Sequence, residues 1–316
     1  MLKIAERVQT EADAYQLLEE WRWHGTPVCP HCGSINDHYF LTPQDPSGVR
    51  KTNRGSTTQR RLWKCKHCRK KFSAITGTIM HGTHIRIRTW VFVIYELCAN
   101  KNGIAAREIE RRYDLTAKSA WFMLHRIREA MAYGPGAELF SGVVVADETW
   151  IGGRPKNRYT DKRVGSKQGP TDKTPVVSLV HAETGEVRSK VVANVSSKTL
   201  RSVIREQANM AEVTLHTDTA SAYGTFAAGL ADHASVNHKA GEYVRNGVST
   251  NKAENYFSQL KRSIAGTHHH VSPEHLHRYL AEFDFRHSSH KLTDSARVDR
   301  LMGRIVGRRL MYSDSR

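Results

Sequence analysis

Apolar residues follow two different patterns along the chain. Up to about residue 135 they recur mainly at helical spacing, as in "EADAYQLLEEWRWHG", "RTWVFVIYELCAN" and "NGIAAREIERRYDLTAKSAWFMLHRIREAM". Further along, "GVVVAD" and "AEVTLHTD" predict buried strands, "TPVVSLVHAETGEVRSKVVANVS" predicts a hairpin that turns at "ETGE", and "SKTLRSVIREQANM" predicts a helix. Helical spacing returns after about residue 250. We therefore expect an α/β domain in this part, with the order strand, strand, strand, helix, strand, helix.

The last helical stretch before this domain predicts two helices joined by a tight turn. The turn falls around Tyr113 to Leu115, and Thr116 is a suitable N-cap for the longer second helix. Such a pair is typical of a helix-turn-helix, in which Lys118 and Ser119 near the start of the second helix would face the bases of the major groove. The alternative is an ordinary helical hairpin that packs its apolar side chains into a core.

Composition points to the class of partner. Lysine and arginine number 48 against 31 for aspartate and glutamate, so the formal charge is +17. This excess favours a polyanionic partner, with nucleic acid ahead of a membrane surface, because no basic amphipathic helix or lipidation signal stands out. The sequence has no run of eighteen apolar residues and no apolar signal-peptide core at its start, so we expect a cytoplasmic protein without a membrane partner.

Four of the five cysteines form two C-x-x-C pairs, "CPHC" and "CKHC", separated by 32 residues. Four thiolates on two turns can close a tetrahedral shell without an open position, which predicts a structural zinc ion. The ligands would be Cys29, Cys32, Cys65 and Cys68. Two independent thiol pairs or a redox couple are the alternative. Cys98 lies in an apolar helical stretch and is expected to be a core residue.

Two acids follow predicted strands, and a third lies on a predicted helix. Asp147 comes after "VVVA" and Asp218 after "VTLHT", both expected at the carboxyl ends of their strands, while Glu254 lies in "STNKAENYFSQLKR". Three such carboxylates could hold two Mg²⁺ ions about 3.5–4 Å apart for in-line attack at a phosphodiester. Lys261 follows Glu254 by seven residues on nearly the same helical face, where it could meet a phosphate.

These residues also have simpler structural interpretations. Asp often ends strands in turns, and Glu254 with Lys261 could belong to a solvated helix face. Glu148, next to Asp147, should point to the opposite face of the strand and act indirectly at most.

The order of these motifs resembles bacterial insertion-sequence transposases of the zinc-ribbon and DDE type, the ISXO-like group. The resemblance runs from about residue 15 to residue 290. It is carried by "CPHCGS", "WKCKHCRKKFSAITGTIM", "AWFMLHRIREAM", "DETWIGG", "HTDTASAY", "VNHKAGEYV" and "TNKAENYFSQLKRSIAGTHHHVSPEHLHRYLAEFDFRHS". It implies an RNase H-like catalytic domain and transposition of the encoding element by cut-and-paste or by copying.

The resemblance assigns roles residue by residue. The family's first two acids fall on Asp147 and Asp218, and its third position falls on the segment from Asn251 to Glu254. We expect Glu254 to be the ligand, because a carboxylate binds Mg²⁺ better than an amide, with Asn251 as its neighbour or substitute. Mn²⁺ can substitute for the two Mg²⁺ ions. Lys261 matches the family's basic position.

The triple histidine matches the family's "HHVS" stretch. For His268, His269 and His270 the resemblance suggests contact with phosphate or positioning of the leaving group, and a packed turn is the alternative.

The expected fold class is α/β, an RNase H-like catalytic domain preceded by a zinc ribbon and a helix-turn-helix. We place the N-terminal helix and ribbon at 1–85, the helix-turn-helix at 86–135, the DDE domain at 136–290 and a basic tail at 291–316. The boundary near 134–141 rests on the Gly and Pro residues of "YGPGAELFSG".

The expected function is binding of terminal inverted repeats, followed by Mg²⁺-dependent strand cleavage and strand transfer. Because an element has two ends, we expect a homodimer or a higher oligomer on DNA. The alternatives are a DNA-binding regulator with a decayed catalytic domain, and a metal-dependent nuclease without transfer activity.

Overall fold

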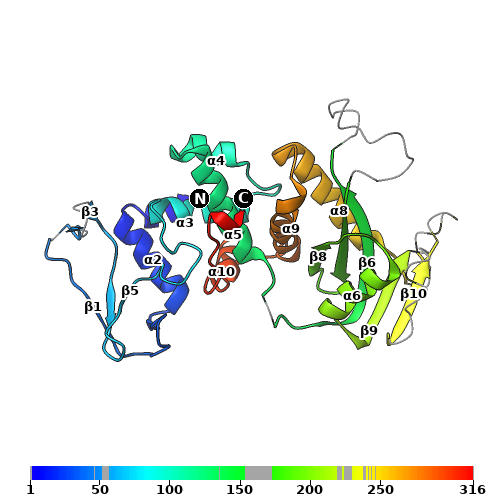
Figure 1. Ribbon diagram of the computed structural model, residues 1–316, viewed down its shortest axis with the longest axis horizontal. Helices are drawn as coiled ribbons and strands as arrows, with labels where there is room; N and C mark the ends of the chain where they lie inside the picture. Colours follow the sequence, from blue (N-terminus) through cyan, green and yellow to red (C-terminus); the bar gives the residue numbers. More distant parts are fainter. Residues whose placement is uncertain are drawn as a thin grey trace. The chain divides into compact units, whose positions relative to one another are not determined.

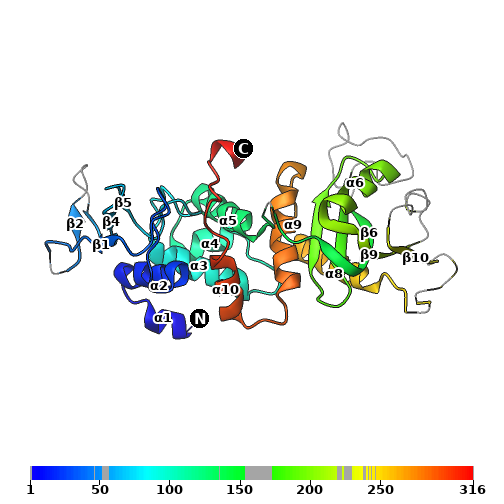
Figure 2. The same cartoon turned by 90° about the horizontal axis from the view of Figure 1, so that it is seen from below.

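The computed structural model describes residues 2–45, 47–51, 57–134, 136–153, 173–218, 223, 230–237, 240, 242, 244–245 and 247–315. The chain forms two compact units. Unit 1 contains Met1–Asn100, Ile104–Met131 and Leu292–Arg316, and unit 2 contains Lys101–Gly103 and Ala132–Lys291. Most elements of both are labelled in Figure 1, and Figure 2 gives a second view.

Unit 1 begins with two helices beside small antiparallel sheets. The helices are α1 (Leu2–Arg7) and α2 (Glu11–Trp23). A three-stranded sheet has the order β1-β4-β5, and β2 pairs with β3. The strands are β1 (His38–Phe40), β2 (Arg50–Lys51), β3 (Thr57–Thr58), β4 (Trp63–Cys65) and β5 (Lys71–Phe72). Helix α2 packs on this sheet, because Trp23 makes edge contacts with Trp63 and Phe72.

The rest of unit 1 is helical. It contains α3 (Ile87–Ala99), α4 (Ala106–Tyr113), α5 (Ala117–Met131), α10 (Asp294–Met302) and the short η5 (Ser313–Ser315). The predicted N-cap is confirmed, because the hydroxyl of Thr116 accepts a hydrogen bond from the backbone N–H of Ser119 at 3.2 Å. The turn between α4 and α5 covers residues 114–116, close to the predicted Tyr113 to Leu115.

The C-terminal segment, residues 303–315, packs within unit 1. Its backbone forms a bridge between Thr78 and Val306, and the N–H of Gly307 donates to the carbonyl of Gly77 at 2.9 Å. Residues 292–316, which the sequence predicts as part of a basic tail, belong to unit 1.

Unit 2 is built on one mixed five-stranded sheet of order β10-β9-β6-β7-β8. Its elements are β6 (Phe140–Ile151), β7 (Thr174–His181), β8 (Val187–Val191), α6 (Ser197–Gln207), β9 (Ala208–Asp218), β10 (Asp232–Val236), α8 (Asn251–Ser263), η4 (Ile264–His268) and α9 (Pro273–Ser288). Strands β6, β7 and β8 are antiparallel neighbours, while β9 is parallel to β6 and β10 is parallel to β9.

Helices cover both faces of this sheet. On one face, Val144 and Ala146 of β6 and Leu215 of β9 share a core with Leu200 and Ile204 of α6. On the other face, side chains of β6 and β7 pack against α8 and α9, among them Val145, Val176, Tyr256, Leu260 and Leu280. The alternation along β6 therefore divides its residues between two cores.

The structure differs from the predicted strands in two ways, one wrong strand end and one strand that the sequence did not predict. Asp147 does not end its strand, because β6 continues to Ile151 and stays paired with β7 as far as Thr174. Strand β10 was not predicted, since its short sequence "DHASV" lacks a continuous apolar run. The predicted hairpin, the helix α6 and the strand β9 that ends at Asp218 are confirmed.

Within the described part of the chain, no helix is both long enough and apolar enough to cross a membrane.

Candidate metal centres and functional residues

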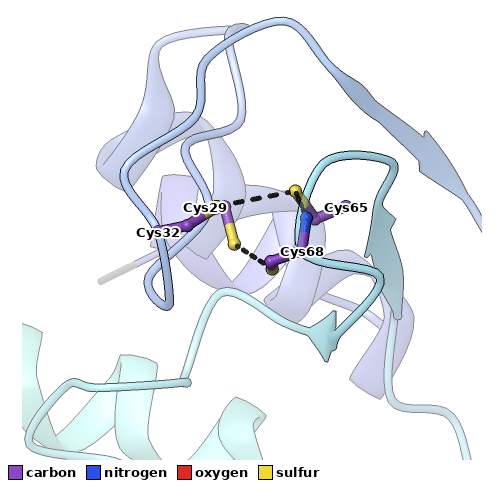
Figure 3. Close-up of side chains that lie close together, drawn as sticks. All are labelled: Cys29, Cys32, Cys65 and Cys68. Carbon is purple, nitrogen blue, oxygen red and sulfur yellow. Dashed lines mark hydrogen bonds between the residues drawn. The ribbon is translucent and has the colours of Figure 1, made fainter.

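The four cysteines of the two C-x-x-C pairs lie together (Figure 3). Their sulfur atoms are all within 4.8 Å of one another, with Cys29 Sγ 3.6 Å from Cys68 Sγ and Cys32 Sγ 3.8 Å from Cys65 Sγ. A tetrahedral zinc ion with Zn–S bonds of about 2.3 Å requires sulfur atoms about 3.8 Å apart. The four sulfurs therefore fit a structural zinc ion, as the sequence predicts.

Tight backbone turns bring these sulfurs together. The carbonyl of Cys29 accepts from the N–H of Gly33 at 2.9 Å, and Gly33 has a φ of 72° that glycine adopts without strain. In the second turn, the N–H of Cys68 donates to the sulfur of Cys65 at 3.5 Å, which stabilises a thiolate there. The fifth cysteine, Cys98, is buried in α3, so its predicted place in the core is confirmed.

Strand register places two of the predicted acids on one face of the unit 2 sheet. Val145 of β6 is level with His216 of β9 in the parallel pairing, so Asp147 and Asp218 each follow two residues later on their strands. Residues two apart share a face, and Val145 packs in the core formed with α8. Asp147 and Asp218 therefore belong to the α8 side of the sheet, on neighbouring strands.

The charges around Asp147 disfavour its ionised form. Burial raises the pKa of Asp147 to about 7, with further contributions from the carboxylates of Glu148, Asp218 and Glu254. The N–H of Glu148, which donates to Asp147 Oδ1 at 2.8 Å, offsets part of this rise. A bound cation would offset both the cost of burying this carboxylate and its repulsion by the neighbouring carboxylates. The oxygen donors suit a hard ion such as Mg²⁺.

The acids are less tightly gathered than the cysteines. In the described ranges, the four cysteines are the group of metal-binding residues whose ligand atoms all lie within 4.8 Å of one another. Glu254 is exposed near the start of α8, one residue after the buried Ala253. The assignment of Asp147, Asp218 and Glu254 to one site remains a prediction.

Glu148 points to the other face of the sheet, the face that α6 covers. The hydroxyl of Tyr223 donates to Glu148 Oε2 at 2.6 Å, and Tyr223 belongs to the core that contains Ala146. Burial raises the pKa of Glu148, partly offset by this hydrogen bond. The alternation rule predicted the orientation of Glu148, but the sequence alone gave no signal for Tyr223 as its partner.

A buried polar network fixes α8 and α9 to strand β8. Asp284 of α9 accepts hydrogen bonds from the Tyr256 hydroxyl at 2.6 Å, and from the Ser189 backbone N–H and hydroxyl at 2.7 Å each. Burial raises the pKa of Asp284 to about 7. Tyr256 lies two residues after Glu254 on α8, so the network holds the helix that carries the third acid. Sequence reasoning missed Asp284, because a single acid in an amphipathic helix normally faces solvent.

The remaining predicted residues of α8 and its continuation have different surroundings. Asn251 and Lys261 are exposed at the two ends of α8. The ring of His268 packs on Tyr279 and Phe283 of α9, with centroids 4.9 and 6.1 Å away.

The other two histidines do not share this packing. His269 and His270 are exposed, and Nδ1 of His269 lies 3.1 Å from the carbonyl oxygen of Ala265. The histidine triplet is thus divided between one packed ring and two surface rings.

In unit 1, the two predicted base-reading residues of α5 already have intramolecular contacts. The ammonium of Lys118 lies 4.3 Å from the ring centroid of Tyr312, in the C-terminal segment. The hydroxyl of Ser119 accepts from Thr116 Oγ1 at 2.9 Å. Their role in DNA binding remains a prediction.

Comparison with known proteins gives two domain matches. Residues 139–288 match the ISXO2-like transposase domain, and residues 9–71 match the transposase zinc-ribbon domain. A relative is the uncharacterized protein in transposable element ISH50 of Halobacterium salinarum, which is 26% identical over 287 residues, covering 88% of this chain and 90% of that protein.

Among solved structures, a chain of the simian T-cell lymphotropic virus intasome complex with the PP2A regulatory subunit B56 gamma aligns with 61% of this chain and 65% of its own length. The identity is 13% and the TM-score is 0.29, which is too low to support a common fold. The two domain matches and the relative from a transposable element show that the chain belongs to the insertion-sequence transposases in which a zinc ribbon precedes an ISXO2-like domain.

Proposed function

We propose that this transposase binds the terminal inverted repeats of its insertion sequence and catalyses Mg²⁺-dependent DNA strand cleavage and strand transfer. The observation that carries the proposal is the charge environment of Asp147, on which Asp218 from the neighbouring strand and Glu254 from α8 both act. The mixed sheet with helices on both faces supports the RNase H-like fold that the sequence resemblance implies.

In this proposal, Asp147, Asp218 and Glu254 hold the metal ions, and Lys261 binds a DNA phosphate. Two Mg²⁺ ions, or Mn²⁺ in their place, supply activation of the attacking oxygen and stabilisation of the leaving oxygen when bound. The bond between Tyr223 and Glu148 restrains β6 beside Asp147, and the Asp284 network restrains α8 beside Glu254. Asn251 lies one helical turn before Glu254, where its amide can contact the same DNA strand.

DNA binding is assigned to unit 1 together with the surface histidines of unit 2. We propose that α4 and α5 form a helix-turn-helix whose second helix enters the major groove with Lys118 and Ser119 at its leading end. His269 and His270 are exposed and can reach phosphates, whereas His268 acts by packing against α9. Because an element has two ends and each chain carries one set of acids, we propose a homodimer or a higher oligomer on DNA.

The test is incubation of the full-length protein and Mg²⁺ with DNA that carries the ends of its element, scoring nicking and joining separately. We expect both products from the native chain and neither from Asp147→Asn, which should still bind the ends. Nicking without joining would support a nuclease without transfer activity. Binding without either product would support a decayed regulator, and cleavage by Asp147→Asn would contradict the ligand assignment.

A further inference from the structure

The C-terminal segment lies along one stripe of α5. Lys118, Phe122 and Arg126 are spaced four residues apart, so they share one face of the helix. Tyr312 packs against the first two, with Lys118 Nζ 4.3 Å from its ring centroid and the ring of Phe122 at 5.5 Å. The charge of Arg309 acts on Arg126, the third member of the stripe. The segment thus follows the helix that we assign to the major groove.

Three arginines of this segment differ in what they contact. Arg304 donates to the carbonyl of Met131 at 3.2 Å, and Arg308 donates to the carbonyl of Glu129 at 2.8 Å, so both hold the segment to the end of α5. The Arg309 side chain is exposed and makes no hydrogen bond or ion pair with the residues that the structure describes. Its charge is therefore available to an external anion.

Arg309 belongs to a cationic cluster, which we define as Arg60, His81, Arg126 and Arg309. Backbone pairing of the C-terminal segment with residues 77–79 brings three parts of unit 1 together, and Arg126 Nη2 donates to the carbonyl of His81 at 2.7 Å. Burial lowers the pKa of His81, and Arg309, Arg60, Arg126 and His31 lower it further, so the charges that act on His81 are positive.

Two members of the cluster are poised to donate to an anion. Nδ1 of His81 accepts from the N–H of Gly77 at 3.1 Å, so the proton of the neutral ring is on Nε2. Arg126 is 5% exposed, and its Nε has no hydrogen-bond partner within the described residues. A phosphate group would accept hydrogen bonds from the unused donors and would reduce the repulsion between the positive charges.

We propose that the Arg309 side chain, at the cationic cluster it forms with Arg60, His81 and Arg126, binds a phosphate of the DNA backbone beside the groove that α5 enters. This inference deepens the proposed function and rests on it, since it assumes that unit 1 binds duplex DNA. It makes the C-terminal segment a part of the DNA-binding surface. Its specificity is for backbone charge, not for base sequence.

The experiment measures binding of the full-length protein to a fluorescent DNA duplex of arbitrary sequence over a series of salt concentrations. Loss of one phosphate contact lowers the slope of log K against log salt by about 0.9. We expect this decrease for Arg309→Gln, and a slope close to the native value for Arg309→Lys. Arg7→Gln is the matched control, because it removes the same charge from an arginine that is already paired with Glu20.

The outcomes separate this inference from the proposed function. Equal slopes for Arg309→Gln and Arg7→Gln would overturn the Arg309 contact while leaving DNA binding intact. No binding by the native protein would overturn the DNA-binding part of the proposed function as well. Thermal unfolding of each variant checks its fold, which we expect to be unchanged because the Arg309 side chain is exposed and makes no hydrogen bond or ion pair with a described residue.

Discussion

The cysteine cluster of unit 1 and the acids of unit 2 are assembled in different ways. Each cysteine pair lies on one tight turn, and the sulfurs reach zinc-binding distances of 3.6 and 3.8 Å. The acids come from two strands and a helix, and burial together with the neighbouring carboxylates raises the pKa of Asp147. Turns preorganise the cysteine site locally, whereas the proposed acid site depends on sheet register and helix packing. The two sites should therefore respond differently to loss of a ligand.

The largest effect is expected from Cys65→Ser. This change removes one of four zinc ligands, and structural zinc contributes roughly 10–16 kcal/mol of apparent binding free energy in small zinc domains. We expect zinc to fall from one ion per chain to none, with unfolding of the ribbon, measured by elemental analysis and limited proteolysis. Cys98→Ala is the control for a thiol outside the cluster and should keep its zinc. Full zinc content in Cys65→Ser would contradict a four-cysteine site.

A smaller effect is expected from the pH dependence that Asp284 gives to unit 2. Its folded pKa of about 7 lies above the unfolded value of 3.8, so the folded state holds a proton that the unfolded state has lost. This contribution is fully present below pH 3.8 and is lost as pH rises through about 7. Between pH 5 and pH 7 the loss is about 2 kcal/mol.

The measurement is the free energy of unfolding of the native chain minus that of Asp284→Asn. We expect this difference to decrease as pH rises from 5 to 8, because the amide does not titrate. Zinc release affects both proteins equally and cancels in the difference. A difference that grows with pH would mean that the buried carboxyl is ionised when folded.

Asp147→Asn should be stabilising in the absence of Mg²⁺, in contrast to Cys65→Ser. It removes a carboxyl whose ionised form is disfavoured by burial and by neighbouring acids. We expect the unfolding temperature to rise by roughly 3 °C, the shift that about 1 kcal/mol gives in a unit of this size. Mg²⁺ should stabilise the native chain more than the variant. A lower unfolding temperature without Mg²⁺ would contradict the repulsion among the acids.

The smallest effect is expected from Lys261→Gln. An exposed ammonium contributes about 1 kcal/mol to a phosphate contact in water, so the Kd for DNA should rise about fivefold. Lys252→Gln is the matched control on the same helix, because Lys252 already donates to the carbonyl of Ala182. An equal rise in Kd for both variants would mean that Lys261 acts only through its charge, which would contradict a specific phosphate contact.

Much of the local structure could be predicted because it depends on short segments. The cap at Thr116, the hairpin between β7 and β8, and the two C-x-x-C turns all follow from neighbouring residues. Asp147 was placed at a strand end because the apolar run stops there, yet pairing with β7 extends the strand to Ile151. Strand β10 was missed for the related reason that its partner, not its composition, makes it a strand.

The sequence by itself determined the zinc ligands and most of the helical and strand segments, and it predicts which acids share a site, because residue type and spacing express local geometry and ligand chemistry. Only the tertiary structure decided that Asp147 and Asp218 share the α8 side of the sheet, that Asp284 anchors Tyr256, and that the C-terminal segment lies on α5. These features depend on contacts between residues far apart in the chain. Register and packing fix such contacts, and no local pattern encodes them.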